Sequence, residues 1–149
     1  IMVCGQNSGL IENVYVETSA DNFVNAHTGA RDFFVFSSEE GNGKVKNCFA
    51  IITGSNADKI YAATTATENY NVNVIGTVES VRVKDGTADN GEVKAFANAA
   101  EFAESGEITR YDSSVWNTDG EYPKLAKNRI ATSDSGKYGN ELFGEDPFV

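Results

Sequence analysis

The chain contains 149 residues, 40% of them hydrophobic and 11% aromatic, and carries a formal net charge of −10. This composition is sufficient for one folded domain and argues against disorder throughout. The acidic surface repels phosphate backbones and anionic lipids, so we expect no nucleic-acid partner. No stretch of about 18 apolar residues could cross a bilayer, and we expect no membrane insertion. Because the first residues lack a signal-peptide pattern, we interpret the chain as a mature or excised piece of a longer protein.

A short pattern recurs three times in the first half of the chain. The copies begin at Gly9, Gly43 and Gly76, and their spacing is therefore nearly even. Each copy reads glycine, any residue, apolar residue, charged residue, asparagine or serine, apolar residue, any residue, apolar residue. A nearly fixed period of this length is typical of repeat architectures, in which each unit buries its apolar face against its neighbours.

Alternation within the copies predicts which side chains face the core. The first apolar position of each copy would point inward and the charged position outward. The inward phase changes at Asn13, Asn47 and Ser80, which predicts a corner between two strands, where asparagine tolerates left-handed dihedral angles. The predicted inward residues are Ile11, Val45 and Val78, followed by Val14 and Val16, Cys48 and Ala50, and Val81 and Val83. The predicted outward residues are Glu12, Lys46 and Glu79, followed by Tyr15, Phe49 and Arg82.

Other strand-like segments surround these copies. Residues 1–4, 33–36 and 72–75 precede the three copies, and weaker apolar pairs follow the first two at residues 23–24 and 60–61. Three short strands per unit predict an all-β fold, a short right-handed parallel β-helix (solenoid) of about three coils over residues 1–83. Successive coils would stack about 4.8 Å apart, with a side-chain ladder from Asn13 and Asn47 and with Ser80 as its third rung. An antiparallel sandwich also has alternating strands, but three copies with preceding strands favour the solenoid.

The pattern changes after the repeats. Residues 84–91 form a polar break, and residues 92–105 predict a helix that Gly106 ends. The apolar stripe of this predicted helix consists of Val93, Phe96, Ala97, Ala100 and Ala103. Phe102 lies outside this stripe. We expect the helix to cap the C-terminal end of the solenoid, because solenoid ends expose core and strand edges.

The segment after this helix carries a resemblance. Residues 108–116 look extended, and Trp116, the turn Asn117-Thr118-Asp119-Gly120 and then Tyr122-Pro123-Lys124-Leu125 follow. This ending resembles the W…DG-x-YP-x-L ending found after β-helical repeats in large bacterial surface proteins, especially those of gut anaerobes. The units ahead of it are similar to the GLUG-type repeats of the same proteins, although Val14, Ser80 and Arg82 depart from the usual pattern.

The resemblance covers about residues 1–125 and implies a cell-surface or secreted module within a multidomain protein, with no particular ligand. We divide the chain into repeats (1–83), the capping helix and the ending (84–125), and a linker or tail (126–149). We expect the tail either to dock on the solenoid flank or to begin another domain.

Few residues suggest a cofactor or metal, and we expect neither. Cys4 and Cys48 fall in different stacking columns, which predicts buried free thiols and no disulfide. No motif places a Ser, Cys or Asp beside His27, so we expect a surface histidine. Asp112, Asp119 and Glu121 lack a calcium-binding pattern, and residues 41–44 lack phosphate-loop spacing.

A catalytic pair is also not favoured. Glu12 and Glu79 would lie two rungs apart, about 9.6 Å, at the edge of the range for an inverting glycosidase. Because Lys46 would lie between them, a stabilising charge ladder is the favoured interpretation, and we expect no enzyme and no catalytic residue.

We therefore expect an extracellular or cell-surface module that is not catalytic. It would space other domains of the same chain, or bind a glycan or a host surface protein through outward residues, of which Tyr15, Phe49 and Arg82 are candidates. The first alternative is a self-assembling structural subunit, such as a filament, phage fibre or decoration protein. The second alternative is a glycan-cleaving β-helix enzyme that uses Glu12 and Glu79.

Overall fold

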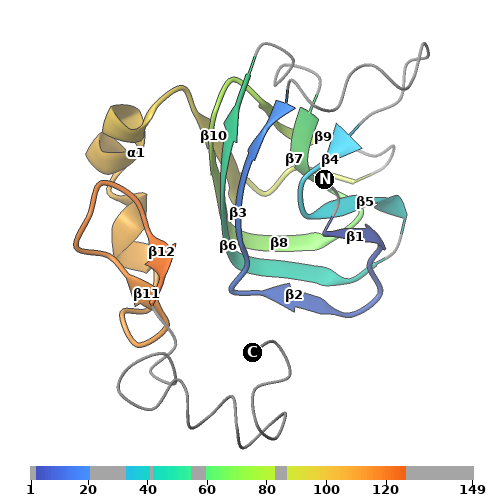
Figure 1. The fold of residues 1–149 in the computed structure, drawn as a ribbon. Helices are drawn as coiled ribbons and strands as arrows, with labels where there is room; N and C mark the ends of the chain where they lie inside the picture. Colours follow the sequence, from blue (N-terminus) through green and yellow to red (C-terminus); the bar gives the residue numbers. More distant parts are fainter. Residues whose placement is uncertain (1–2, 21–32, 41, 55–59, 83–86, 127–149) are drawn as a thin grey trace, which may run out of the picture.

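The computed structural model describes residues 3–20, 33–40, 42–54, 60–82 and 87–126 (Figure 1). This part of the chain is mostly β-structure, and its sheets consist largely of parallel strands. The described residues contain a single α-helix, and none of their sheets is closed. That helix is too short to span a bilayer.

Within these ranges ten strands precede the helix, and every described pairing among them is parallel. The largest sheet has the order β10-β8-β6-β2, with β3 also paired to β6. A second sheet has the order β4-β7-β9, and β1 pairs with β5. The strands are β1 (Cys4–Gln6), β2 (Leu10–Glu12), β3 (Tyr15–Ser19), β4 (Phe33–Phe34), β5 (Ser37–Glu40), β6 (Lys44–Thr53), β7 (Ile60–Thr64), β8 (Glu68–Ile75), β9 (Glu79–Arg82) and β10 (Val93–Phe96).

The first two copies of the sequence pattern stack as expected. Ile11 of β2 lies beside Val45 of β6, and Tyr15 of β3 lies beside Phe49. Both pairs join equivalent positions of the copies that begin at Gly9 and Gly43. The predicted register of these copies is confirmed.

The predicted place of the third copy is wrong. Lys46 pairs with Tyr70 of β8, which precedes the third copy in the chain, whereas Glu79 lies in β9 beside Tyr61. The step from β6 to β8 is shorter than the sequence period because a tight turn joins β7 to β8, in which Thr67 Oγ1 donates to Thr64 O at 3.0 Å. The outward column is therefore Glu12, Lys46 and Tyr70, and Glu79 belongs to another sheet.

Asparagines mark the corner of the large sheet. Asn13, Asn47 and Asn71 have φ angles of 56°, 50° and 51°, and no other non-glycine residue in the described part of the chain has a positive φ. The left-handed corners predicted at Asn13 and Asn47 are confirmed, and the third rung is Asn71 rather than Ser80. Asparagine suits these positions because its short side chain lowers the cost of the left-handed conformation by bonding locally.

The inner face of the large sheet forms the main core. Val45, Cys48 and Ala50 are buried there with Val72 and Val74, and Val14 and Val16 pack against them. The inward assignment of these repeat positions is confirmed.

The two cysteines differ in their surroundings. No disulfide joins them in the structure, and Cys48 is buried as predicted, whereas Cys4 is only half-buried. Burial raises the pKa of Cys48 to about 12, so this thiol stays protonated at neutral pH.

The predicted helix over 92–105 is wrong in its first half. Residues Val93–Phe96 are β10, in register with Val72–Ile75 of β8, and α1 covers only Ala99–Ser105. Apolar side chains at alternate positions let β10 extend the sheet, and this pairing outweighs the helical propensity of the local sequence. Asn98 begins α1 by accepting a hydrogen bond from Glu101 N at 3.0 Å, and Gly106 ends it with φ 75°, as predicted.

The rest of the described chain lies on the outer face of the large sheet. After α1 come a 3₁₀ helix, η4 (Glu107–Arg110), where an extended segment was predicted, and an antiparallel hairpin of β11 (Trp116–Asn117) and β12 (Lys124–Leu125). In Figure 1 these elements lie side by side along one flank of the strands. We name residues 97–126 the C-terminal segment. It covers a sheet face rather than forming a cap made of helix 92–105.

Candidate functional site at the C-terminal hairpin

An aromatic cluster joins the C-terminal segment to the outer face of the sheet. Phe49 is 0% exposed and lies 5.1 Å from Phe102 and 5.9 Å from Tyr122, measured between ring centroids. Phe102, the residue off the predicted helical stripe, is the one that α1 buries. The cluster also contains Ile75, Tyr111 and Trp116.

This cluster changes the set of candidate binding residues. Phe49 points outward as predicted, but it is covered, so the expectation that it forms an exposed binding surface is wrong. Tyr15 is half-buried at the edge of the cluster, and its hydroxyl donates to Glu17 Oε2 at 2.9 Å. Arg82 lies in β9, in a different sheet from Tyr15 and Phe49. These three residues therefore form no common column.

The asparagine corner provides a second contact with the C-terminal segment. Asn71 Nδ2 donates to Asn47 Oδ1 at 3.1 Å and to the carbonyl oxygen of Arg110 at 3.3 Å. At the corner between β2 and β3, the indole nitrogen of Trp116 donates to Asn13 Oδ1 at 3.2 Å. These bonds satisfy the buried amide of Asn71, which would otherwise destabilise the interior, and they tie the half-buried amides of Asn13 and Asn47 to the same corner.

Tyr111 and Asn73 continue this network inside the cluster. Asn73 Nδ2 donates to the Tyr111 hydroxyl at 2.9 Å, and that hydroxyl donates to the carbonyl oxygen of Cys48 at 2.9 Å. Burial raises the pKa of Tyr111, so the phenol remains a neutral donor. Asn73 Oδ1 has no protein partner among the described residues.

Glu92 follows the three asparagines at the corner position of β10. Its carboxylate accepts from Asn71 N at 2.9 Å and from the Arg110 guanidinium at 2.5 Å. Arg110 also donates to Glu107, which pairs with Lys94. Partial burial alone would raise the pKa of Glu92 and Glu107, but these donors outweigh it and lower both. The segment therefore contacts the corner from the β10 end, at Arg110, to the β2 end, at Trp116.

Two buried residues fix the hairpin at the end of this segment. Trp116 and Pro123 are almost fully buried, and Trp116 pairs with Leu125 across the hairpin. The turn is closed locally, because Asn117 Oδ1 accepts from Asp119 N at 3.0 Å. The tryptophan and proline of the W…DG-x-YP-x-L ending thus hold the hairpin in place.

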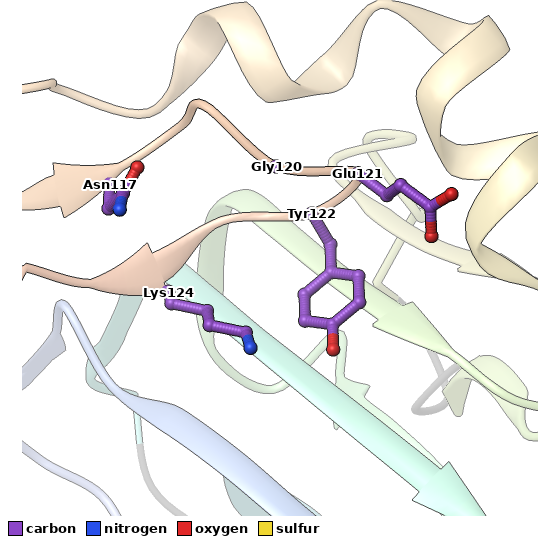
Figure 2. A pocket seen from close by; sticks show the side chains of 5 residues that line it. All are labelled: Asn117, Gly120, Glu121, Tyr122 and Lys124. Carbon is purple, nitrogen blue, oxygen red and sulfur yellow. The ribbon is translucent and has the colours of Figure 1, made fainter.

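Two open hollows lie beside the hairpin. The first, of about 340 Å³, is lined by Asn117, Gly120, Glu121, Tyr122 and Lys124 (Figure 2). The second, of about 530 Å³, is lined by Ser113, Trp116, Asn117, Thr118, Asp119, Lys124, Leu125 and Ala126. Both combine exposed polar groups with part of an aromatic or aliphatic residue.

Tyr122 is the aromatic residue of the first hollow, and it packs against the sheet. The Tyr122 ring is nearly parallel to the Phe49 ring, at 7°. Lys124 extends toward Tyr122, with Nζ 5.2 Å from its ring centroid, whereas Glu121 extends away from both (Figure 2). The sequence pattern marked this segment as an ending, but it did not identify Asn117, Gly120 or Lys124 as lining residues. Those three become neighbours only when the hairpin forms.

Other sequence candidates do not join this site. Asp112 Oδ1 accepts from Ser114 N at 2.8 Å, so it caps a local turn. Within the ranges that the structure describes, no three His, Cys, Asp or Glu side chains gather as a metal site would need. His27 and residues 127–149 lie outside those ranges. Glu12 and Glu79 lie in different sheets, so the predicted charge ladder of Glu12, Lys46 and Glu79 is wrong, and the alternative that pairs the two carboxylates loses its geometry.

Comparisons with protein-family models, with curated proteins and with solved structures found no match.

Proposed function

We propose that the parallel sheets are coils of a short right-handed parallel β-helix. The support comes from strands that add in parallel on each pass of the chain, and from a corner that repeats at Asn13, Asn47 and Asn71. On this proposal the C-terminal segment closes the flank of the β-helix rather than its end.

The function that we propose is a non-catalytic module of a larger bacterial cell-surface or secreted protein. Its β-helix would act as a rigid spacer, and its hairpin would bind a glycan or a surface protein. One observation carries this proposal: Trp116 and Pro123 are buried anchors, while polar turn residues between and beside them line an open hollow. A rigid support lowers the entropy that binding would otherwise cost.

Binding screens on glycan and surface-protein arrays test this function. The wild-type protein should bind at least one class of array target, and the double variant Glu121→Ala, Lys124→Ala should lose that binding. Glu104→Ala, an exposed change on α1, is the matched control and should retain it. Binding that both variants retain would exclude the hairpin as the recognition surface.

A self-assembling subunit remains the second candidate, and one observation favours it. Leu10 on β2 is 57% exposed and Val3 is 39% exposed, so apolar side chains lie at the β1–β2 end of the sheets. Exposed edge strands with apolar side chains favour pairing between chains. Sedimentation over a wide concentration range tests this candidate: assembly that Leu10→Ser reverses would support it, and a monomer at all concentrations would exclude it.

A further inference from the structure

We propose that the hollow lined by Asn117, Gly120, Glu121, Tyr122 and Lys124 binds a neutral pyranose unit of a glycan. This inference rests on the proposed recognition function and adds the chemical class of the ligand. It depends on three features of the hollow: a fixed aromatic ring, a mixture of donors and acceptors, and balanced charge.

Tyr122 provides the fixed aromatic ring. It is half-buried, and its packing on Phe49 holds the ring in one orientation before any ligand arrives. A tyrosine side chain supplies a large contact area at a low entropic cost, because it has only two side-chain torsions. Its ring can pack against the C–H groups of a sugar, while its hydroxyl remains available for a hydrogen bond.

The polar lining matches hydroxyl groups, which both donate and accept hydrogen bonds. The Lys124 ammonium only donates, whereas the Asn117 side chain and the Tyr122 hydroxyl both donate and accept. Asn117 and Lys124 face each other across the hairpin, so the backbone pairing of β11 with β12 sets their relative positions. A few polar groups placed around an aromatic surface are the usual basis of ligand orientation.

Charge selects a neutral sugar over an acidic one. Glu121 and Lys124 carry opposite charges, so they leave the lining without a net charge. The whole chain carries −10, which repels sialylated, uronic or sulfated glycans over distances of about 10 Å. A neutral ligand encounters neither a local nor a global repulsion.

Gly120 allows a sharp steric test. A Cβ atom added there would meet its nearest neighbour, Tyr122 O, at 3.8 Å, which is ordinary contact. Gly120→Leu should therefore place a side chain in the hollow without straining the turn. Ala100→Leu is the matched control, because Ala100 is exposed on α1 and lines neither hollow.

The experiment compares calorimetric titrations of these proteins with neutral hexose oligosaccharides and with oligogalacturonate and sialyllactose. Circular dichroism first checks that the melting temperatures agree. We expect wild type and Ala100→Leu to bind a neutral oligosaccharide and Gly120→Leu to bind it at least about tenfold more weakly. Acidic sugars should bind more weakly than neutral ones. Lys124→Ala, which removes the donor that extends toward Tyr122, should weaken the same binding.

The outcomes separate this inference from the proposed function. Binding of acidic glycans or of a protein target that Gly120→Leu abolishes, without binding of neutral sugars, would overturn the ligand class but keep the recognition function. Neutral-sugar binding that Gly120→Leu leaves unchanged would overturn the assignment to this hollow. An absence of binding to every glycan and protein probe would overturn both.

Discussion

The strands β1–β10 and the C-terminal segment are stabilised in different ways. In the strands, small apolar residues of neighbouring strands lie in register, as Cys48, Val72 and Val93 do. In the segment, large aromatic residues make contacts that occur once, as Phe102 does with Phe49. The segment also has few backbone pairings of its own, since the strands of its hairpin are very short. The strands are therefore stabilised by repeated contacts with neighbouring strands, whereas the C-terminal segment depends on the sheet face on which it packs.

The asparagine corner is where the two regions meet. Asn71 takes part in both, because its amide bonds Asn47 within the sheet and the Arg110 carbonyl in the segment. At the β10 end of the corner, Glu92 replaces the amide by a carboxylate and pairs with Arg110. The following changes should separate the two regions, from the largest expected effect to the smallest.

Val45→Asp should unfold the whole domain. Val45 is 0% exposed, and an unpaired carboxylate there should lower the free energy of unfolding by about 5 kcal/mol or more. Lys44→Gln, at the exposed neighbouring position, loses only a surface ion pair with Glu68 and should cost less than about 1 kcal/mol. Urea titrations followed by far-UV circular dichroism measure both. Equal effects of the two changes would contradict the inward and outward assignment.

Trp116→Ala should release the C-terminal segment from the sheet. Loss of a buried tryptophan costs about 3–5 kcal/mol, and we expect near-UV circular dichroism to weaken while far-UV circular dichroism largely remains. Trp116→Phe keeps an aromatic ring but removes the bond to Asn13, so it should cost closer to about 1 kcal/mol.

The fluorescence of the wild-type protein reports directly on whether the C-terminal segment depends on the sheet, because Trp116 is the single tryptophan of the chain. Its fluorescence should change at or below the urea concentration at which the far-UV signal changes. Fluorescence that changes only after the strands have unfolded would mean that the segment does not depend on the sheet.

Asn71→Ala should destabilise the protein by about 2–4 kcal/mol, because it removes buried hydrogen bonds and forces a Cβ-bearing residue without local side-chain bonding into φ 51°. Asn71→Gly loses the same bonds but tolerates the dihedral angle, so it should be about 1–2 kcal/mol more stable than Asn71→Ala. Thermal and urea unfolding measure the difference. Equal stability of the two variants would mean that the left-handed corner carries no conformational cost.

Acid should weaken the junction between the regions. Because Glu92 and Glu107 have a lowered pKa in the folded protein, their contribution is present above the ordinary value of 4.5 and decreases as the pH falls through it. The melting temperature should therefore drop below about pH 4.5. Glu92→Gln should reduce that drop and leave a lower, flatter profile. An unchanged profile in this variant would show that Glu92 is not among the groups responsible.

Parts of the fold could be predicted because they depend on neighbours in the sequence. The alternation around Ile11 and Val45 marked the buried side, and the change of inward phase at Asn13 and Asn47 marked the corners. The third copy was correctly predicted to be a strand, but it was assigned to the wrong place. The tight turn before β8 brings Asn71, rather than Ser80, to the third corner position. Likewise, residues 93–96 carry helical and strand patterns together, and pairing with β8 decided between them.

The candidate site was harder to predict from the sequence than the strands were. Tyr122 and Pro123 belonged to a recognisable ending, but nothing local said that Tyr122 would stack on Phe49, which lies far earlier in the chain. The same contact covers Phe49, which alternation alone had marked as an outward residue.

By itself, the sequence determined that the chain is rich in β-structure, where two of its left-handed asparagine corners lie and which repeat residues face the core. These properties follow from backbone sterics and from a period of two, both of which act over short stretches of chain. Only the tertiary structure decided which strand lies third at the corner, which face the C-terminal segment covers and which side chains surround the hollow. Those outcomes depend on contacts between distant residues, whose energies favour one register and one docking position among several that the local pattern allows.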